Sequence, residues 1–212
     1  MTAATDVPAP DLPAPRIVRR VGRARLPLPY RPAALLLVAL STPALVTTAI
    51  TFHAVSLLGG RGIDAPAAAA ALSLLGIAAA AGTLAAGAIA DRLGTRSLLA
   101  VLTGTLTAGS AILLVPSGAA SYLAFAVIGL GNGVWGVTNG IVWARTYGLA
   151  SLGRIQGLAS AATIAAAAAG PLPLAISDGA TGSYAAGLLF LLVSAALALA
   201  AALAWRAPRS TG

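Results

Sequence analysis

Six long apolar runs, separated by short polar connections, dominate the pattern of hydrophobic and polar positions after residue 32. Each run is about as long as the roughly 20 residues that a helix needs to cross a bilayer, or a little longer. A segment in lipid must satisfy its own backbone hydrogen bonds, so such runs predict helices, and their continuous apolar character argues against barrel strands. The predicted spans are Ala33–Leu58, Ala67–Ala90, Ser97–Val115, Ala119–Trp143, Ile155–Ile176 and Tyr184–Trp205. The pattern therefore predicts an all-α integral membrane protein with a six-helix transmembrane domain over residues 33–205.

The two ends of the chain differ from this apolar region. Residues 1–32 hold seven prolines and six arginines with few adjacent apolar residues. Such a segment cannot bury enough surface to offset the entropy of ordering, so we predict a disordered cytoplasmic tail. Residues 206–212 are predicted to form a second, shorter cytoplasmic tail.

Charge is scarce and unevenly placed. Only 8% of the 212 residues are charged, against about a quarter in a soluble domain, and thirteen arginines give a net charge of +8. With the N-terminus inside, twelve arginines fall on the cytoplasmic side and only Arg61 falls outside, as the positive-inside rule requires. We therefore predict a multi-pass protein of the cell (inner or plasma) membrane with both termini in the cytoplasm. Arginines spread between apolar runs argue against a nucleic-acid partner.

Reactive side chains are few. The chain has no cysteine and one histidine, which excludes a disulfide framework, a thiolate metal site and a multi-histidine metal site. The spans contain no Ser-His-Asp arrangement, paired carboxylates or phosphate-binding loop. We therefore expect no enzyme activity, no cofactor and no metal.

A motif of the form G-x-x-x-D-R-x-G-x-R joins the second and third predicted spans, with Gly87, Asp91, Arg92, Gly94 and Arg96 at the fixed positions. Gly87 lies one turn before Asp91, where it would let a neighbouring helix approach closely. Asp91 can accept from an arginine or from exposed helix amides, and Gly94 permits a tight reversal with positive φ. Any cytoplasmic loop can carry such residues, but the whole pattern between two spans on the arginine-rich side is much more specific.

This motif resembles the signature loop of the major facilitator superfamily, whose members contain two six-helix halves, each a 3+3 inverted repeat. The resemblance implies that the five motif residues form a cytoplasmic gate that latches one state of an alternating-access cycle. It also implies a partner: a second copy of this chain, a separately encoded half, or an N-terminal region of a longer chain.

Residues elsewhere resemble the C-terminal half of the monocarboxylate-porter-like branch of this superfamily. The matching segments are Phe52-His53 with Leu57, Gly59 to Asp64, Gly170-Pro171, Asp178, and Thr181 to Tyr184. This resemblance implies transport of a small solute, such as an organic anion, together with a co-transported proton. The Asp–Arg couple that some members carry in the second helix is absent here.

Polar side chains within the spans are the candidates for a substrate cavity. Asn132, Trp135 and Asn139 share one face of the fourth span, and Thr47 and Thr51 share a face of the first. Polar groups in spans usually face the bundle interior or water, which favours a cavity. Hydrogen bonding between packed helices, or back to the helix's own carbonyls for threonine, explains the same residues.

Three further positions have both a functional and a structural interpretation. His53, near the outer end of the first span, could bind substrate or respond to protons, or it is a hydrogen-bonded interfacial residue. Gly170 and Pro171 predict a break in the fifth span, a feature of transporter binding sites but also a common one in membrane helices. The glycine pairs of the fourth span, Gly129/Gly133 and Gly136/Gly140, predict close helix packing.

Two functional hypotheses follow. The first is one half of a secondary transporter, with a small solute bound between this bundle and a partner bundle. The alternative is a facilitator-like half that has only a structural or assembly role.

Overall fold

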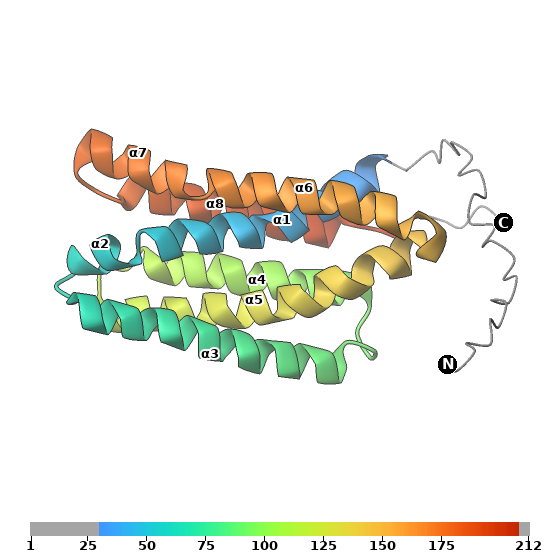
Figure 1. Cartoon of the computed structure of the whole chain (residues 1–212), viewed down its shortest axis with the longest axis horizontal. Coiled ribbons are helices and arrows are strands. Elements are labelled where there is room, and N and C mark those ends of the chain that lie inside the picture. The colour runs from blue at the N-terminus through green and yellow to red at the C-terminus, as the bar shows by residue number, and fades with distance from the viewer. Residues whose placement is uncertain (1–29, 208–212) are drawn as a thin grey trace, which may run out of the picture.

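The structure, a computed structural model, describes residues 30–207. In that part of the chain it contains eight α-helices and one short 3-10 helix (Figure 1). Their bounds are α1 Tyr30–Phe52, α2 Ala54–Gly59, α3 Ala65–Ile89, α4 Thr95–Leu113, α5 Gly118–Tyr147, η1 Leu149–Ser151, α6 Leu152–Ala169, α7 Pro171–Thr181 and α8 Ala185–Ala204. No strand is present between residues 30 and 207.

Six helical stretches are long and apolar enough to cross a membrane: α1, α3, α4, α5, α6 together with α7, and α8. The predicted all-α, six-span fold is therefore confirmed. The first helix begins at Tyr30, a few residues before the predicted Ala33, so the last residues of the predicted disordered tail are helical. The rest of that tail, and residues 208–212 of the C-terminal tail, lie outside the described residues.

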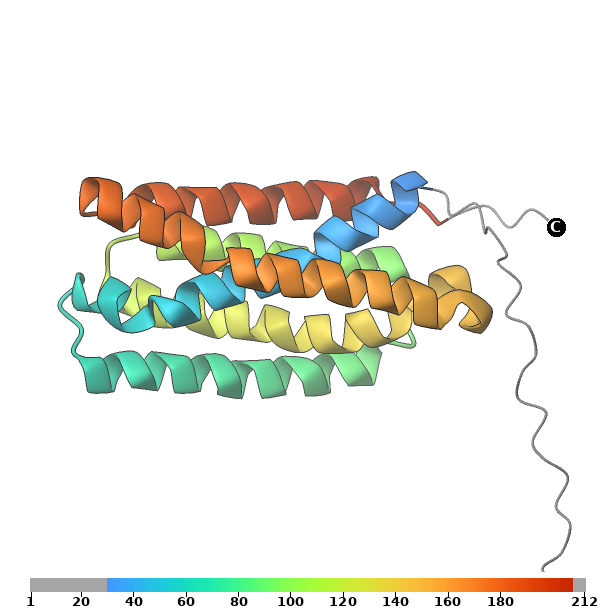
Figure 2. The same cartoon turned by 45° about the horizontal axis from the view of Figure 1, so that its top comes forward.

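The helices run roughly parallel in an elongated bundle (Figures 1 and 2). We call the end at which α1 begins and α8 ends the terminal end; the α3–α4 and α5–α6 connections also lie there. The opposite, far end carries α2 and the α4–α5 and α7–α8 connections. Of the arginines in residues 30–207, only Arg61 lies at the far end. This uneven placement agrees with the arginine pattern that predicted orientation.

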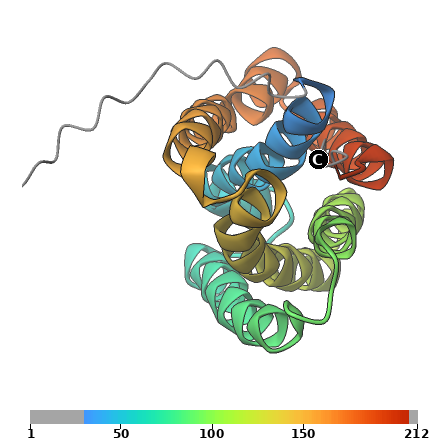
Figure 3. The same cartoon turned by 90° about the vertical axis from the view of Figure 1, so that its right-hand side faces the viewer.

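Figure 3, viewed along the bundle, shows two groups of helices: α1 with α6, α7 and α8, and α5 with α3 and α4. The first triplet of spans is α1, α3 and α4, and the second is α5, α6–α7 and α8. Each group therefore combines the first span of one triplet with the second and third spans of the other triplet. The contacts show the same symmetry. The second span of each triplet packs against the first span of the other, as α3 does on α5 and α6 on α1. The third span does the same, as α4 does on α5 and α8 on α1. Because α5 is the third span after α1, the triplets have opposite orientation, as in an inverted repeat.

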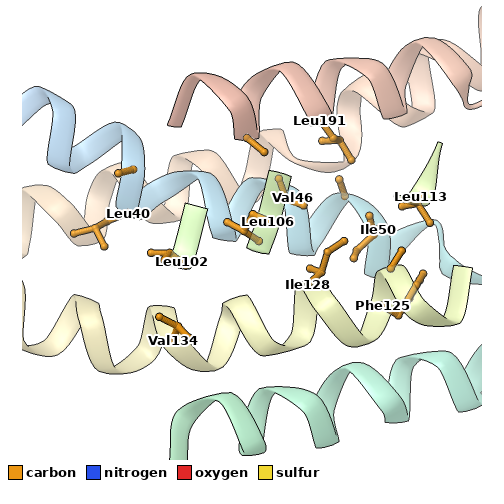
Figure 4. Close-up of a cluster of buried hydrophobic side chains, with 14 of the residues drawn as sticks. Leu40, Val46, Ile50, Leu102, Leu106, Leu113, Phe125, Ile128, Val134 and Leu191 are labelled. Carbon is orange, nitrogen blue, oxygen red and sulfur yellow. The ribbon is translucent and has the colours of Figure 1, made fainter. Parts of the chain in front are cut away.

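Leucine, isoleucine and phenylalanine side chains fill the centre where the two groups meet (Figure 4). Leu40, Leu102, Leu106, Phe125 and Ile128 are almost completely buried there. Large apolar residues also cover the outside: Leu84 is 77% exposed and Leu197 is 62% exposed. Such a surface suits lipid rather than water, because lipid tails solvate these side chains at no cost.

Candidate functional site

Thr47 of α1 and Asn132 of α5 form a reciprocal hydrogen-bonded pair inside the bundle. The Thr47 hydroxyl donates to Asn132 Oδ1 at 3.0 Å, and Asn132 Nδ2 donates back to Thr47 Oγ1 at 2.8 Å. Both residues are half-buried. Asn132 lies midway along its span, and α1 and α5 are the equivalent first helices of the two repeats. The pair therefore joins the two repeats near the middle of the membrane-spanning region.

The other polar residues of α5 are also bonded. Trp135 Nε1 donates to the carbonyl of Leu40 in α1 at 2.7 Å. Pro43 of α1 cannot donate to the carbonyl of Ala39, so the hydrogen bonding of α1 itself is weakened in this turn. Trp135 thus packs against α1 beside Asn132, as the helix-packing interpretation predicts.

Asn139 and Thr51 make only local bonds. Asn139 Oδ1 accepts from Trp143 Nε1 at 3.0 Å within the same helix, and the Thr51 hydroxyl donates to the Thr47 carbonyl at 2.8 Å. Both side chains are half-buried. Their candidate role in a substrate cavity stays a prediction.

His53 lies outside this polar group, between α1 and α2 at the far end. Its Nδ1 lies 3.1 Å from the carbonyl of Ala49. Its ring packs edge-to-face on Tyr184, with centroids 5.7 Å apart, and the Tyr184 hydroxyl donates to Ser56 Oγ at 2.9 Å. The predicted cavity residues therefore divide between the middle of the bundle and its far end.

A cavity of about 470 Å³ opens at the far end, and its polar wall contains Ser56, Arg61, Asp178 and Tyr184. The sequence singled out Asp178 only through the family resemblance; it used Arg61 for orientation and as part of the Gly59 to Asp64 segment of the same resemblance. The isolated position of Arg61, the single arginine predicted to lie outside, was the sequence feature that could have indicated this cavity.

The Arg61 guanidinium is tied to the end of α4. It donates to the carbonyls of Leu113 at 2.6 Å and Val115 at 3.2 Å, and to Ser121 Oγ at 2.8 Å. Partial burial lowers the pKa of Arg61, because desolvation disfavours the charged form. The group still stays protonated at neutral pH.

The signature-like loop lies at the terminal end. Asp91 forms an ion pair of 3.3 Å with Arg145, from the last turn of α5. Arg145 also donates to the carbonyls of Ala90 and Leu93 at 3.2 Å. Of the two kinds of donor that the sequence allowed for Asp91, the structure therefore has an arginine, and this arginine comes from α5. Arg92 and Arg96 are exposed.

One expectation about the glycines of this loop is wrong, and the other finds no support within residues 30–207. Gly94 has φ −69° and ψ 156°, an extended conformation at the N-cap of α4, so no positive φ is needed. Gly87 would have nothing within 4 Å of an added Cβ, so no helix in residues 30–207 approaches it closely. The reversal instead follows from the extended residue before α4.

The fifth span is interrupted at Gly170 and Pro171, as the sequence predicted. Pro171 has no N–H to donate to the carbonyl of Ala167 four residues earlier. That carbonyl accepts from the Gly170 N–H at 3.2 Å, and the Thr48 hydroxyl of α1 lies 3.0 Å from it while also lying 2.7 Å from the carbonyl of Ala44 in its own helix. Gly170 is buried beside it, and an added Cβ would overlap Thr48 and come within 2.6 Å of the Leu45 carbonyl. The break is therefore held against α1, on the same helix as Thr47.

A scan of family models and a search of curated proteins both find no match to this chain. The fold and the side chains define a multi-span membrane protein with six spans. No cluster of three His, Cys, Asp or Glu side chains that could hold a metal occurs between residues 30 and 207.

Proposed function

We propose that this chain is one half of a secondary transporter of the major facilitator type, which moves a small solute by alternating access between this bundle and a second six-helix bundle. The observation that carries the proposal is the Thr47–Asn132 pair, which joins the first helices of two inverted repeats near mid-span. Such transporters bind substrate near the bilayer midplane, which is the level of this pair along its helices. A small organic anion, with or without a proton, is the substrate class that the sequence resemblance favours.

The surface of α5 next to this pair supports a partner bundle. Gly136 and Gly140 are exposed, and a Cβ added to either would have nothing within 4 Å. Glycine lowers helix stability, and in membrane helices it is typically used where another backbone approaches closely. A second bundle, from another copy, a separate chain or a longer form of this chain, would use that space.

The Asp91–Arg145 pair fits a gate better than a structural anchor. Asp91 is 99% exposed, and an exposed ion pair contributes about 0–1 kcal/mol to stability. A contact of this strength can break and re-form during a transport cycle. Gly87, Arg92, Gly94 and Arg96 would form the rest of the gate, as the motif resemblance implies.

The test is complementation in native cells that lack this chain. Membrane vesicles from cells expressing the wild type, Asn132→Leu or Ser73→Ala would be given isotope-labelled small organic acids. Ser73 is the matched control, because it is exposed on α3 and bonds only to the carbonyl of Ala69 in its own helix. We expect uptake with the wild type and Ser73→Ala, and its loss in Asn132→Leu at equal membrane abundance.

A role in assembly alone is the second candidate. The exposed α5 surface at Gly136 and Gly140 supports it as well as it supports transport, since helix association alone explains that surface. Under this alternative, restoring the wild-type chain would leave uptake of every labelled acid unchanged. Asn132→Leu would then alter only stability, by about 0.6–2 kcal/mol for lost interhelical hydrogen bonds.

A further inference from the structure

A second cavity lies at the terminal end, in the seam between the start of α1 and the end of α8. Its volume is about 390 Å³, and its lining is Arg31, Pro32, Ala34, Leu35, Ala204 and Arg206. Two arginine side chains therefore line a cavity whose other lining residues are apolar. Neither arginine belongs to the signature-like loop or to the Thr47–Asn132 group.

The charge of this seam is unbalanced within the described residues. Arg31 and Arg206 are both exposed, and the one ion pair found between residues 30 and 207 is Asp91–Arg145. The described aspartates besides Asp91, which are Asp64 and Asp178, belong to the far end. The seam therefore presents two guanidinium groups that suit bidentate binding of a phosphate.

The apolar part of the seam continues along both helices toward mid-membrane. On α1, Val38 lies one turn beyond Ala34 and is 45% exposed. On α8, Ala200 and Leu197 lie one and two turns before Ala204, and Leu197 is 62% exposed. Residues spaced by three or four share a helix face, so each helix carries an exposed apolar stripe that starts at the cavity. Trp205, only 5% exposed, fixes the end of α8 beside Arg206.

We propose that this seam binds an anionic phospholipid, with its phosphate between Arg31 and Arg206 and an acyl chain along the Ala34–Val38 and Leu197–Ala204 stripes. Both helices are membrane spans, so the cavity lies at the level of the lipid headgroups. Basic pockets between spans are known to suit such headgroups. A free phosphate would use the arginines but leave the apolar stripes unexplained. The site does not depend on transport.

The test uses the full chain purified in mild detergent, with the melting temperature followed as lipid is added. We expect phosphatidylglycerol to raise it, and phosphatidylcholine or inorganic phosphate at equal concentration to leave it unchanged. The double variant Arg31→Gln/Arg206→Gln should bind phosphatidylglycerol about 30-fold more weakly, since each arginine near an anionic lipid contributes about five- to sixfold to affinity.

The double variant Arg92→Gln/Arg96→Gln is the matched control, because it removes two exposed cations from the same end. It should keep the wild-type affinity. Equal loss in both double variants would mean diffuse charge attraction without a site, and would overturn the proposal. If inorganic phosphate raised the melting temperature as much as phosphatidylglycerol does, the site would bind simple anions and the lipid proposal would fail. If Arg31→Gln/Arg206→Gln bound phosphatidylglycerol as tightly as the wild type, the seam would be excluded as the lipid site.

Discussion

Four glycines on one face of α5 meet two different environments. Gly129 and Gly133 are buried under α3, where an added Cβ would overlap the carbonyls of Leu75 and Ala79 respectively. Gly136 and Gly140, further along the same face, would have open space beside an added Cβ. The first pair therefore closes a contact inside this bundle, whereas the second pair leaves a smooth surface that nothing in residues 30–207 covers.

This difference predicts opposite effects for the same substitution. Gly133→Ala should destabilise the bundle by about 1–3 kcal/mol, since the methyl group must push α3 and α5 apart. Gly136→Ala should be neutral or slightly stabilising, because alanine is the better helix former and meets no atom. Unfolding of the purified chain in mixed detergent micelles would measure both. Equal destabilisation by the two variants would contradict the packing described here.

The sequence could identify these residues but not their surroundings. The spacing of Gly129/Gly133 and Gly136/Gly140 predicted close packing for both pairs, and only the first is packed. Spacing fixes which face a residue occupies, but the relative tilt of α3 and α5 decides where along that face the helices touch. The local bond of Asn139 to Trp143 was missed for a similar reason, since it depends on side-chain rotamers.

At the scale of the helices, the ends and breaks are held by side chains from distant segments. Arg61 fixes the α2–α3 connection to the carbonyls at the end of α4, and the Thr48 hydroxyl contacts the Ala167 carbonyl beside Pro171. Span existence and length were predictable because they depend on local composition. These bonds were not, because Thr48 and Ala167 are far apart in the sequence and only the folded bundle brings them together.

The Arg61 contact predicts sensitivity to the shape of the cation as well as its charge. Arg61→Lys should destabilise the chain by about 1–2 kcal/mol, because one ammonium cannot reach three acceptors that the planar guanidinium contacts together. Arg96→Lys, at an exposed site, is the control and should change stability by less than about 0.5 kcal/mol. Chemical unfolding of both variants in detergent measures the difference. A lysine variant as stable as the wild type would mean that only the charge matters.

For the whole molecule, the exchange of first helices between triplets explains why α1 and α5 carry so much of the polar chemistry. They lie where the two groups of helices meet, so their side chains bond across the repeat interface, as Thr47–Asn132 and Trp135–Leu40 do. The six spans were predictable from composition. The packing of α3 against α5 and of α1 against α6 could not be predicted, because apolar runs of similar composition do not show which helices pack together.

The α5 surface around Gly136 and Gly140, which no described residue covers, predicts how the chain assembles. The sequence has no cysteine, so a single introduced cysteine reports only its own surroundings. Gly140→Cys should form a cross-link in native membranes with a short bifunctional thiol reagent if a second copy covers this surface, doubling the 20.6 kDa mass on a denaturing gel. Leu197→Cys, on an exposed apolar face of α8, is the control and should stay monomeric. Thiol–amine reagents at Gly140→Cys would capture a different partner half, seen as a product of another mass. A Gly140→Cys chain that yields no product with either reagent would contradict a second copy or a separately encoded half at this surface.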